Sequence, residues 1–589
     1  MRRSSPATRP ARRSRRERGF VVLWMAMVLL LLIGVAAFAV DLVHAYVVGQ
    51  EAQNAADAAA LGGVTALQND LTGTAAINRA ADLADKNGFA SGVTATPTGA
   101  NQLTVEVKQD VDTWFAKIFG IDTLSVDRTA VAEYDPPVAM GSPANNIGDV
   151  PAGSCTDAGF LAGPPVPCVS AHFAANANQN LFAQVVGPDA PSSQGNPYTT
   201  RNCSSFYPTD GCTGPGAGNN TLYDGAEYFF ISNDMPGGDI TPYVYDGAYV
   251  NTGFGFCDTT TNGITNADPA RYAKNSPYCA ADLVTGGLAG IIPPVGTQFE
   301  LLGPDGDLDP TNNPVLCSTG IIPGEEPPNG TPITNPITLA NFEKWQPICP
   351  AGSPTIHGAT ADKFHPYEIR VTTSATGEGT NNFSLMALHD PGTPPTNGLA
   401  VYTSERLPLF ASKNGATGPA AFYVARVLPS SRPRTLNLDL FDLGDSIGGG
   451  GTGSLQVFAV PDYNAGTEVP LAGCTFTQPV GSPPDGSNYD LAPPWGSAAD
   501  IVSAPTCGQV SSEIQYDATA PGAMGSHYWQ GQWVTISIPI PAKPAYSCTT
   551  NLFENCWIKL RITPNRGQQL GDATTWNAHM AGGPVRLVG

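Results

Sequence analysis

The sequence predicts a transmembrane helix near the N-terminus with a small α+β module, followed by a large, disulfide-containing, mainly β exterior region. We expect this exterior region to be a β-sandwich. Three observations lead to the prediction. Residues 19–40 form an apolar run without a charge, and residues 41–134 mix helical and strand patterns. All 12 cysteines lie after residue 150, among short strand-like segments.

The apolar run, GFVVLWMAMVLLLLIGVAAFAV, has 22 residues. A helix of about 20 apolar residues spans the hydrocarbon core of a bilayer, because it satisfies its own backbone polar groups in lipid. Residues 1–18 contain eight arginines, and the next basic residue after the run is Arg79. The positive-inside rule therefore predicts a single-pass cell-membrane protein, with an Arg-rich cytoplasmic head and residues 41–589 extracytoplasmic.

A cleaved secretory signal is the alternative reading of this segment. Ala37-Phe38-Ala39 fits an A-x-A cleavage pattern, and the arginines would form the basic n-region. However, the run is longer than the roughly 7–15 apolar residues of a usual signal. A retained anchor is therefore the preferred interpretation, and both readings export the same residues.

Charge divides at the same boundary. The first 18 residues carry eight arginines and one glutamate, so the net charge of −21 for the whole chain becomes −28 on residues 19–589. An acidic exterior argues against nucleic acid as a partner. The partner that the arginine head predicts is the lipid bilayer, through its anionic headgroups.

Residues 41–134 predict a helical stalk and a small α+β unit. The anchor helix continues through the alanine-rich segment 41–61 and stops or kinks at Gly62-Gly63. A second helix is expected from Thr74, as N-cap, to Lys86, before Asn87-Gly88. Alternating apolar residues then predict a strand, a short apolar helix and a second strand, at 103–108, 112–120 and 123–134.

Three short motifs in this region carry a resemblance to a known family. They are Arg18-Gly19 before the apolar run, Ala39-Val40-Asp41 at its end, and the segment QNAADAAA at 53–60. Together they resemble the N-terminal segment of the TadE/TadG-like proteins of Flp (Tad) pilus assembly, which are bacterial membrane proteins. The stretch VKQDVDTWFAKIFGIDTLSVDRTAVAEY resembles the strand, turn and strand that close this module. The resemblance covers about 115 of the 589 residues, and it implies other Tad pilus-assembly proteins as partners.

One departure from the family bears on function. The resemblance implies that pilin-type substrates carry a glutamate five residues into the mature apolar segment. Counted from Phe20, that position is Trp24 in this chain. A carboxylate in lipid is unfavourable and is retained for a function, so its replacement favours an uncleaved accessory protein over a polymerising pilin. The D-x-S-x-S metal motif of von Willebrand A domains, which many TadG-like proteins carry, does not occur here.

The exterior sequence falls into two predicted domains. Residues 135–365 form a Cys/Gly/Pro-rich β region with eight cysteines, and residues 366–589 form a β-sandwich-like domain. Short apolar segments separated by Gly, Pro and Ser turns support the second assignment. The predicted strands there are 367–373, 382–388, 421–427, 436–441, 455–460, 533–538 and 556–562, with 585–588 as a last strand.

Cysteine spacing favours structural disulfides in an oxidising compartment. The count is even and no C-x-x-C motif occurs, which argues against a zinc knuckle or a redox site. Sequential pairing is the simplest hypothesis, although the connectivity cannot be deduced from spacing. Cys548 and Cys556 would close the loop before a strand that carries Trp557.

The sequence does not predict an enzyme. Gly444-Asp445-Ser446-Ile447-Gly448 matches G-x-S-x-G, but a nucleophile elbow needs a strand-turn-helix context. A glycine-rich stretch and a predicted strand follow this serine instead, so a glycine-rich hairpin is the preferred interpretation. No catalytic residue and no cofactor are expected, apart from candidate calcium loops.

Calcium and glycan are the candidate ligands of the exterior region. Asp305, Asp307 and Asp309 alternate as in calcium loops, but Pro310 and Leu316 occupy the sixth and twelfth positions, where an EF-type loop needs Gly and Glu. A solvated acidic turn is therefore the default reading. Exposed aromatics such as Tyr528-Trp529 are candidates for stacking on sugar rings, although tryptophan more often lies in a core.

Two functional hypotheses follow from the sequence. The first is a membrane-anchored, TadE/TadG-like cell-envelope protein that is accessory to Flp/Tad pilus assembly or surface attachment. The second is an anchored or secreted adhesin or carbohydrate-binding module, unrelated to pilus assembly, with a glycan or cell-wall ligand. The first predicts interaction with other Tad components through residues 19–134, and the second predicts that residues 135–589 bind a ligand alone.

Overall fold

The computed structural model forms two compact units. Unit 1 comprises Met1–Pro136 with Gly583–Gly589, and unit 2 comprises Pro137–Gly582. Unit 2 is therefore one continuous segment inserted between two segments of unit 1. The residues that the structure describes are 15–69, 73–99, 102–134, 138–150, 181–187, 196, 226–233, 239–246, 295–304, 312–323, 344–350, 353, 356–357, 366–374, 379–389, 399–404, 406–412, 420–430, 433–441, 452–471, 473–477, 513–517, 533–549, 553–564, 571–582 and 585–588.

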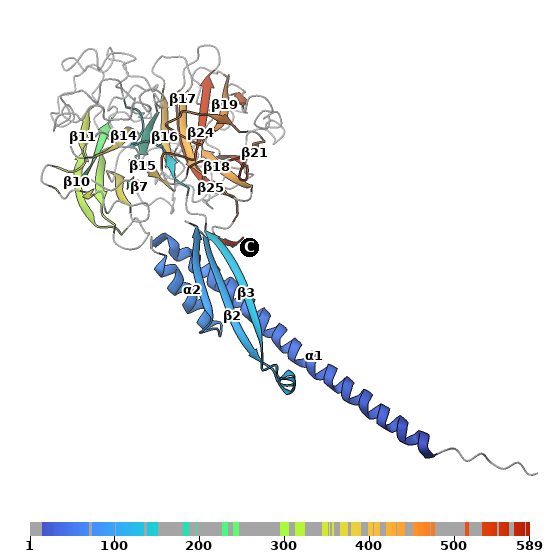
Figure 1. Cartoon of the computed structure of the whole chain (residues 1–589). Helices are drawn as coiled ribbons and strands as arrows, with labels where there is room; N and C mark the ends of the chain where they lie inside the picture. The colour runs from blue at the N-terminus through green and yellow to red at the C-terminus, as the bar shows by residue number, and fades with distance from the viewer. Residues whose placement is uncertain are drawn as a thin grey trace, which may run out of the picture. The chain divides into compact units, whose positions relative to one another are not determined.

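Helix α1 (Arg15–Val64) contains the apolar run and the alanine-rich segment in 50 unbroken residues (Figure 1). A straight helix of this length is about 75 Å long. The α-helix ends at Val64, one residue beyond the predicted stop or kink at Gly62-Gly63, and the 3-10 turn η1 (Thr65–Asn69) follows it. Gly63 lies against the side chain of Leu103, so close packing explains this glycine better than a turn does.

Helix α2 (Thr74–Lys86) has the predicted bounds, and its C-cap is Asn87, followed by Gly88 with a φ of 94°. The prediction of Thr74 as N-cap is wrong. Gly73 occupies that position with a φ of 71° in the left-handed region, where glycine carries no steric penalty.

Four antiparallel strands form the sheet of unit 1, in the order β1-β2-β3-β26. Leu103, Val105 and Val107 on β2 are buried, as their alternation predicts. Only the 3-10 turn η2 (Ala116–Phe119) lies where a short helix is predicted, at the tip of the β2–β3 hairpin. The strands are β1 (Val93–Gly99), β2 (Gln102–Asp112), β3 (Thr123–Tyr134) and β26 (Val585–Leu587).

Strand β26 brings distant residues back to unit 1. Leu587 lies opposite Ala132 in the register, and the Val588 N–H donates a hydrogen bond of 2.9 Å to the Val131 carbonyl. Arg586 forms an ion pair of 3.3 Å with Glu133. The prediction that residues 366–589 form one domain therefore needs correction, because 583–589 belong to unit 1 through backbone pairing.

The described residues of unit 2 form two antiparallel sheets of 11 strands each. In the first, the order is β10-β9-β13-β7-β15-β4-β17-β24-β19-β20, with β22 also paired to β19. Its strands are β4 (Met140–Gly141), β7 (Ala226–Asn233), β9 (Thr297–Leu302), β10 (Val315–Ile322), β13 (Tyr367–Thr373), β15 (Leu399–Thr403), β17 (Ala420–Arg426), β19 (Thr452–Val460), β20 (Val469–Pro470), β22 (Glu513–Asp517) and β24 (Trp557–Pro564).

In the second sheet, the order is β11-β8-β14-β6-β16-β25-β18-β23-β21, with β12 paired to β8 and β5 to β14. Its strands are β5 (Asn146–Ile147), β6 (Leu181–Val186), β8 (Asp239–Asp246), β11 (Trp345–Pro347), β12 (Ile356–His357), β14 (Thr380–His389), β16 (Leu407–Ser412), β18 (Arg434–Phe441), β21 (Thr475–Thr477), β23 (Trp533–Ile540) and β25 (Gly571–Met580). The seven strands predicted between residues 367 and 562 are all confirmed within a few residues.

The two sheets share one apolar core. Phe299 on β9 meets Phe383 on β14 edge-on, with ring centroids 5.1 Å apart. Phe422 on β17 meets Trp576 on β25 in the same way at 4.5 Å. Such edge-to-face pairs add to the stability gained from burial. The structure thus shows a mainly β unit with antiparallel sheets, and the β-sandwich stays a prediction.

Strands from both predicted exterior domains belong to the same sheet. Leu302 on β9 lies opposite Glu368 on β13, so the predicted boundary between 365 and 366 falls between two paired strands. The separate domains 135–365 and 366–589 therefore need correction to one unit. Their different compositions misled the prediction, because the glycines, prolines and cysteines of residues 135–365 are counted over whole segments, whereas pairing involves only the short strands within them.

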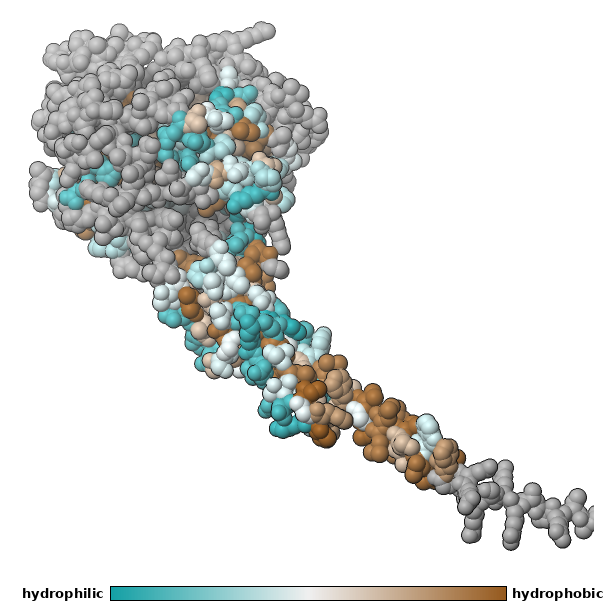
Figure 2. All heavy atoms as spheres, in the orientation of Figure 1, coloured by the Kyte–Doolittle hydropathy of each residue, from teal (hydrophilic) through white to brown (hydrophobic). Residues whose placement is uncertain are grey.

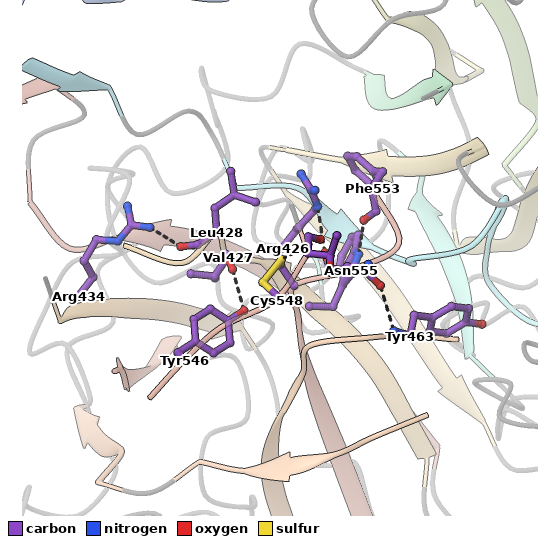
Figure 3. Close-up of a disulfide and its surroundings, with 12 residues drawn as sticks. Arg426, Val427, Leu428, Arg434, Tyr463, Tyr546, Cys548, Phe553 and Asn555 are labelled. Carbon is purple, nitrogen blue, oxygen red and sulfur yellow. Dashed lines mark hydrogen bonds between the residues drawn. A yellow bond between two sulfur atoms is a disulfide. The ribbon is translucent and has the colours of Figure 1, made fainter. Parts of the chain in front are cut away.

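Two described disulfides link cysteines that are neighbours in the sequence, as sequential pairing predicts. Cys317 is bonded to Cys349 and Cys548 to Cys556. The second disulfide closes the loop before β24 (Figure 3). Two residues before Cys548, the Tyr546 hydroxyl donates to the Val427 carbonyl at 2.7 Å, and the Val427 N–H donates to the Cys556 carbonyl at 2.8 Å. These contacts bind the loop to the end of β17.

A group of charged side chains lies on β24 and the turn before β20. The Lys559 ammonium is 2.9 Å from the Glu468 carboxylate, and the Arg561 guanidinium is 2.5 Å from it. The Lys559 side chain is only 7% exposed. Because a buried ammonium needs a compensating charge, Glu468 stabilises this part of the sheet.

Candidate functional site

The first half of α1 has no cover within the described residues. Every large apolar side chain from Phe20 to Val40 is at least 45% exposed. A helix in a soluble domain would bury an apolar stripe along its length. Figure 2 shows these hydrophobic residues covering the helix on the face in view. The segment is long and apolar enough to cross a membrane, and it fits a membrane anchor.

A buried carboxylate follows the apolar run directly. Asp41 is only 2% exposed and is the first residue of α1 after the apolar run. Its Oδ1 accepts the Trp114 N–H at 2.9 Å, and its Oδ2 accepts the N–H groups of Phe115 and Ala116 at 3.0 and 2.6 Å. Three backbone donors at the tip of the β2–β3 hairpin therefore converge on one side chain of the anchor helix.

Neighbouring contacts hold the same hairpin tip in place. The His44 ring stacks on the Trp114 ring at 4.5 Å, one turn of α1 beyond Asp41. Thr113 closes the base of the tip, where its N–H donates to the Asp122 carbonyl at 3.0 Å. The tip is thus a compact loop, fixed by hydrogen bonds to α1 and across its own base.

The alanine-rich segment explains how the second half of α1 joins unit 1. Five alanines at helical spacing have no exposed surface, namely Ala52, Ala55, Ala56, Ala59 and Ala60. They share one core cluster with three buried alanines of α2 and with the buried residues of β2. Small side chains let the helix backbones approach closely, so the QNAADAAA motif encodes a packing stripe rather than a chemical site.

Two glycines and two polar side chains complete this contact. A Cβ on Gly63 would lie 2.6 Å from Leu103 Cδ2 and 3.1 Å from a backbone oxygen of α2, which leaves no space for a side chain. At the other end of the stripe, the Arg128 Nε–H donates to the Gly49 carbonyl at 3.2 Å. Gln53 donates to Asp57 at 2.8 Å and to the Thr129 carbonyl at 3.3 Å.

Among the described residues, no cluster of three or more His, Cys, Asp or Glu side chains could hold a metal ion. The calcium candidates Asp305, Asp307 and Asp309 lie outside the described residues, as does the G-x-S-x-G segment 444–448. The candidate aromatic pair Tyr528-Trp529 also lies outside them. Three other tryptophans are at most 1% exposed and belong to the core, namely Trp345, Trp557 and Trp576.

The docking of the hairpin on Asp41 was not predicted from the sequence. The signal available was a single acid placed directly after an apolar run, at a position that the family resemblance also includes. Its partners lie 73 to 75 residues later along the chain. Neither spacing nor composition could identify them, because the three donors are backbone N–H groups that every sequence supplies.

This geometry defines a class of protein. An apolar helix, exposed over its first half and built into a folded α+β module over its second half, is the arrangement of a membrane-anchored protein with a folded support at the anchor. Residues 19–66 match the family model described as putative Flp pilus-assembly TadE/G-like. The N-terminal module of this chain is therefore TadE/G-like, and the matched residues coincide with the anchor and its alanine stripe. No curated protein and no solved structure matches the chain.

Proposed function

We propose that this chain is an accessory protein of Flp/Tad pilus assembly or surface attachment, anchored in the cell membrane by one helix. The TadE/G-like match over α1 carries the proposal. In this reading residues 1–18 are cytoplasmic and residues 41–589 are extracytoplasmic. The eight arginines before the apolar run and the disulfides of unit 2 support that orientation.

The accessory role is preferred to that of a polymerising pilin for two reasons. Trp24 stands where the family resemblance implies a glutamate in pilin-type substrates, and it is exposed on the apolar helix. In addition, unit 2 is inserted between β3 and β26, and its described strands form two extended sheets. Interaction with other Tad components would use the TadE/G-like module.

The proposed role is non-catalytic and needs no cofactor. Support of a membrane assembly requires binding surfaces and an anchor, both of which the described residues supply. Within the described residues nothing supports a glycan or cell-wall ligand, since Trp345, Trp557 and Trp576 are core residues. An adhesin is therefore not proposed, and the protease experiment described next would favour a secreted binding protein only if it released a soluble chain.

Protease shaving of intact protoplasts tests the anchor and its orientation. A protected membrane fragment that begins before Phe20, with unit 2 removed by the protease, is the expected result. A mature chain that begins near Phe20 would favour a pilin-like subunit instead. A soluble chain that begins at Val40 would contradict the anchor and favour a secreted binding protein.

Cross-linking in a cell that makes the Tad machinery tests the role. A photoreactive residue at Glu51, which is exposed on α1, is expected to give adducts with other Tad proteins. The matched control is a photoreactive residue at Ile321, which is 59% exposed on β10 of unit 2. Adducts with Tad components from Ile321 and none from Glu51 would contradict the assignment of this role to the TadE/G-like module.

A further inference from the structure

The tip of the β2–β3 hairpin exposes large apolar side chains, of which Trp114 is partly covered by the His44 ring. Trp114, Phe115, Ile118, Phe119 and Ile121 lie within eight residues, and Ile118 and Phe119 are 79% and 76% exposed. The backbone of this loop is held in place by its hydrogen bonds to Asp41 and across Thr113. A fixed loop that presents aromatic and aliphatic groups to its surroundings indicates a binding surface.

The position of the tip along α1 shows what the surface meets. The tip is held by Asp41, the first residue after the 22-residue apolar run. That run is about 33 Å long as a helix, close to the roughly 30 Å of a bilayer's hydrocarbon core. The loop therefore lies at the level where the hydrocarbon core meets the headgroups.

The helix surface around the tip is also apolar. Leu42, Val43, Tyr46 and Val47 are all exposed beyond Asp41, and the next charged residue on the helix is Glu51. From Phe20 to Val47 the helix is about 42 Å long, which matches the roughly 40–45 Å of a bilayer with its headgroup layers. Figure 2 shows brown atoms continuing from the helix to the end of the hairpin.

Asp41 does not interrupt this apolar surface. Its carboxylate is buried and accepts three backbone N–H groups, so its charge is compensated within the protein. The same three bonds satisfy the backbone donors of the tip, which would otherwise be unfavourable in a poorly hydrated layer. Lys117, which is exposed on the tip, is placed to reach lipid phosphates.

We propose that the loop Trp114–Ile121 inserts into the interfacial layer of the bilayer beside the anchor helix, as a second membrane contact of unit 1. The proposal rests on the proposed membrane anchoring of α1. Trp, Phe and Ile next to a lysine are the groups that favour the membrane interface. Two contacts instead of one would fix the rotation and tilt of α1, since a single helix can rotate freely about its axis.

Lipid is the occupant because the exposed Trp, Phe and Ile side chains of the tip lie next to the apolar surface of the membrane segment, and the charged residues at the tip, Lys117 and Asp122, can remain among the headgroups. A protein partner would need to lie at the same depth in the bilayer. The loop alone is also small for a specific protein interface, which typically involves about 20–30 residues on each side. A protein occupant is therefore an alternative that the test must exclude.

Photo-cross-linking of the full chain in a lipid bilayer tests the proposal. The chain is reconstituted in nanodiscs of equimolar phosphatidylglycerol and phosphatidylcholine, with a photoreactive residue in place of Ile118. Leu31, which is exposed in the apolar run, is the positive control, and Thr129, which is exposed on β3 of the same hairpin, is the negative control. Adducts are identified by intact-mass and peptide mass spectrometry.

Lipid adducts are expected from Ile118 and Leu31 and not from Thr129. Lipid adducts from Leu31 with none from Ile118, or protein adducts from Ile118, would overturn the inference and leave the anchor intact. No lipid adduct from Leu31 would overturn the proposed anchor and this inference with it. A second variant, F119D with the probe at Ile118, should lose the lipid adducts, because a carboxylate withdraws the loop from the apolar layer.

Discussion

Replacing Asp41 by alanine should detach the hairpin tip from α1. The substitution leaves the N–H groups of Trp114, Phe115 and Ala116 without their acceptor. A hydrogen bond to a charged group contributes about 1.5–3 kcal/mol, and the Ala116 bond is the buried one of the three. Water can partly replace the acceptor for the other two donors, which belong to exposed residues. The total loss is therefore about 3–5 kcal/mol of local stability.

Hydrogen exchange of the full chain in detergent, followed by mass spectrometry, measures this loss. A local destabilisation of about 3 kcal/mol should speed exchange in peptides that cover 110–124 by about 100-fold, because each 1.4 kcal/mol is a factor of ten. Asp41→Asn keeps one acceptor oxygen without the charge and should show a smaller increase. Asp57→Ala is the matched control, since Asp57 lies on the same helix and accepts a hydrogen bond from Gln53, one turn away.

Unchanged exchange in 110–124 for Asp41→Ala would refute the reasoning. It would mean that the tip is held by packing of its apolar side chains and the Trp114–His44 stack rather than by the carboxylate. Faster exchange throughout unit 1, equal for Asp41→Ala and Asp57→Ala, would also contradict a local capping role.

Three further predictions concern packing and charge. Gly63→Val should destabilise unit 1 by about 1–3 kcal/mol, because the new side chain overpacks against Leu103. Gly34→Val is the control and should be nearly neutral, because a Cβ at Gly34 has no neighbour within 4 Å. Thermal unfolding in detergent measures both variants. Glu468→Gln leaves the buried Lys559 ammonium without a compensating charge and should lower the free energy of unfolding of unit 2 by about 3–5 kcal/mol. Denaturant unfolding measures this loss. Adding Lys559→Met to the variant should recover part of it. The hydrogen bond to Asp439 raises the pKa of His579 above its ordinary value of 6.5. The raised pKa means that protonated His579 stabilises the folded state. This contribution of His579 to the free energy of unfolding is fully present below about pH 6.5, and it is lost as the pH rises through the folded-state pKa. The stability difference between the native chain and His579→Gln should therefore shrink with rising pH. At low pH it should be at most about 1 kcal/mol, because the imidazole is half exposed. A stability difference that does not change with pH would contradict the assignment of this effect to the His579–Asp439 pair.

Elements with a local signal could be predicted from the sequence. Helix α2 has both predicted bounds, and the strands of unit 2 with alternating or continuous apolar residues lie where expected. Strand β1 could not be found in this way, because its sequence VTATPTG lacks large apolar residues and contains a proline. The anchor was predictable for the opposite reason, since an uninterrupted apolar run of this length is typical of a membrane-spanning helix.

Features that depend on distant pairing could not be predicted. The Asp41 contacts join residues more than 70 positions apart. Strand β26 pairs with β3 although all of unit 2 lies between them in the sequence. The sequence 585–588 reads as a strand, but nothing in it distinguishes a partner in unit 1 from one in unit 2. Likewise, the pairing of β9 with β13 crosses a composition boundary that suggested two domains.

The insertion of unit 2 between β3 and β26 also imposes an order on synthesis. Val585 is made 451 residues after Tyr134, its partner in the sheet. At about 5–20 residues per second, the ribosome needs roughly 20–90 s to cover that distance. During this time the edge of β3 that β26 later occupies has free N–H and C=O groups, which can template wrong pairings. A chain that stalls before residue 585 keeps this edge open, so correct closure of the sheet reports that the entire inserted unit has been translated.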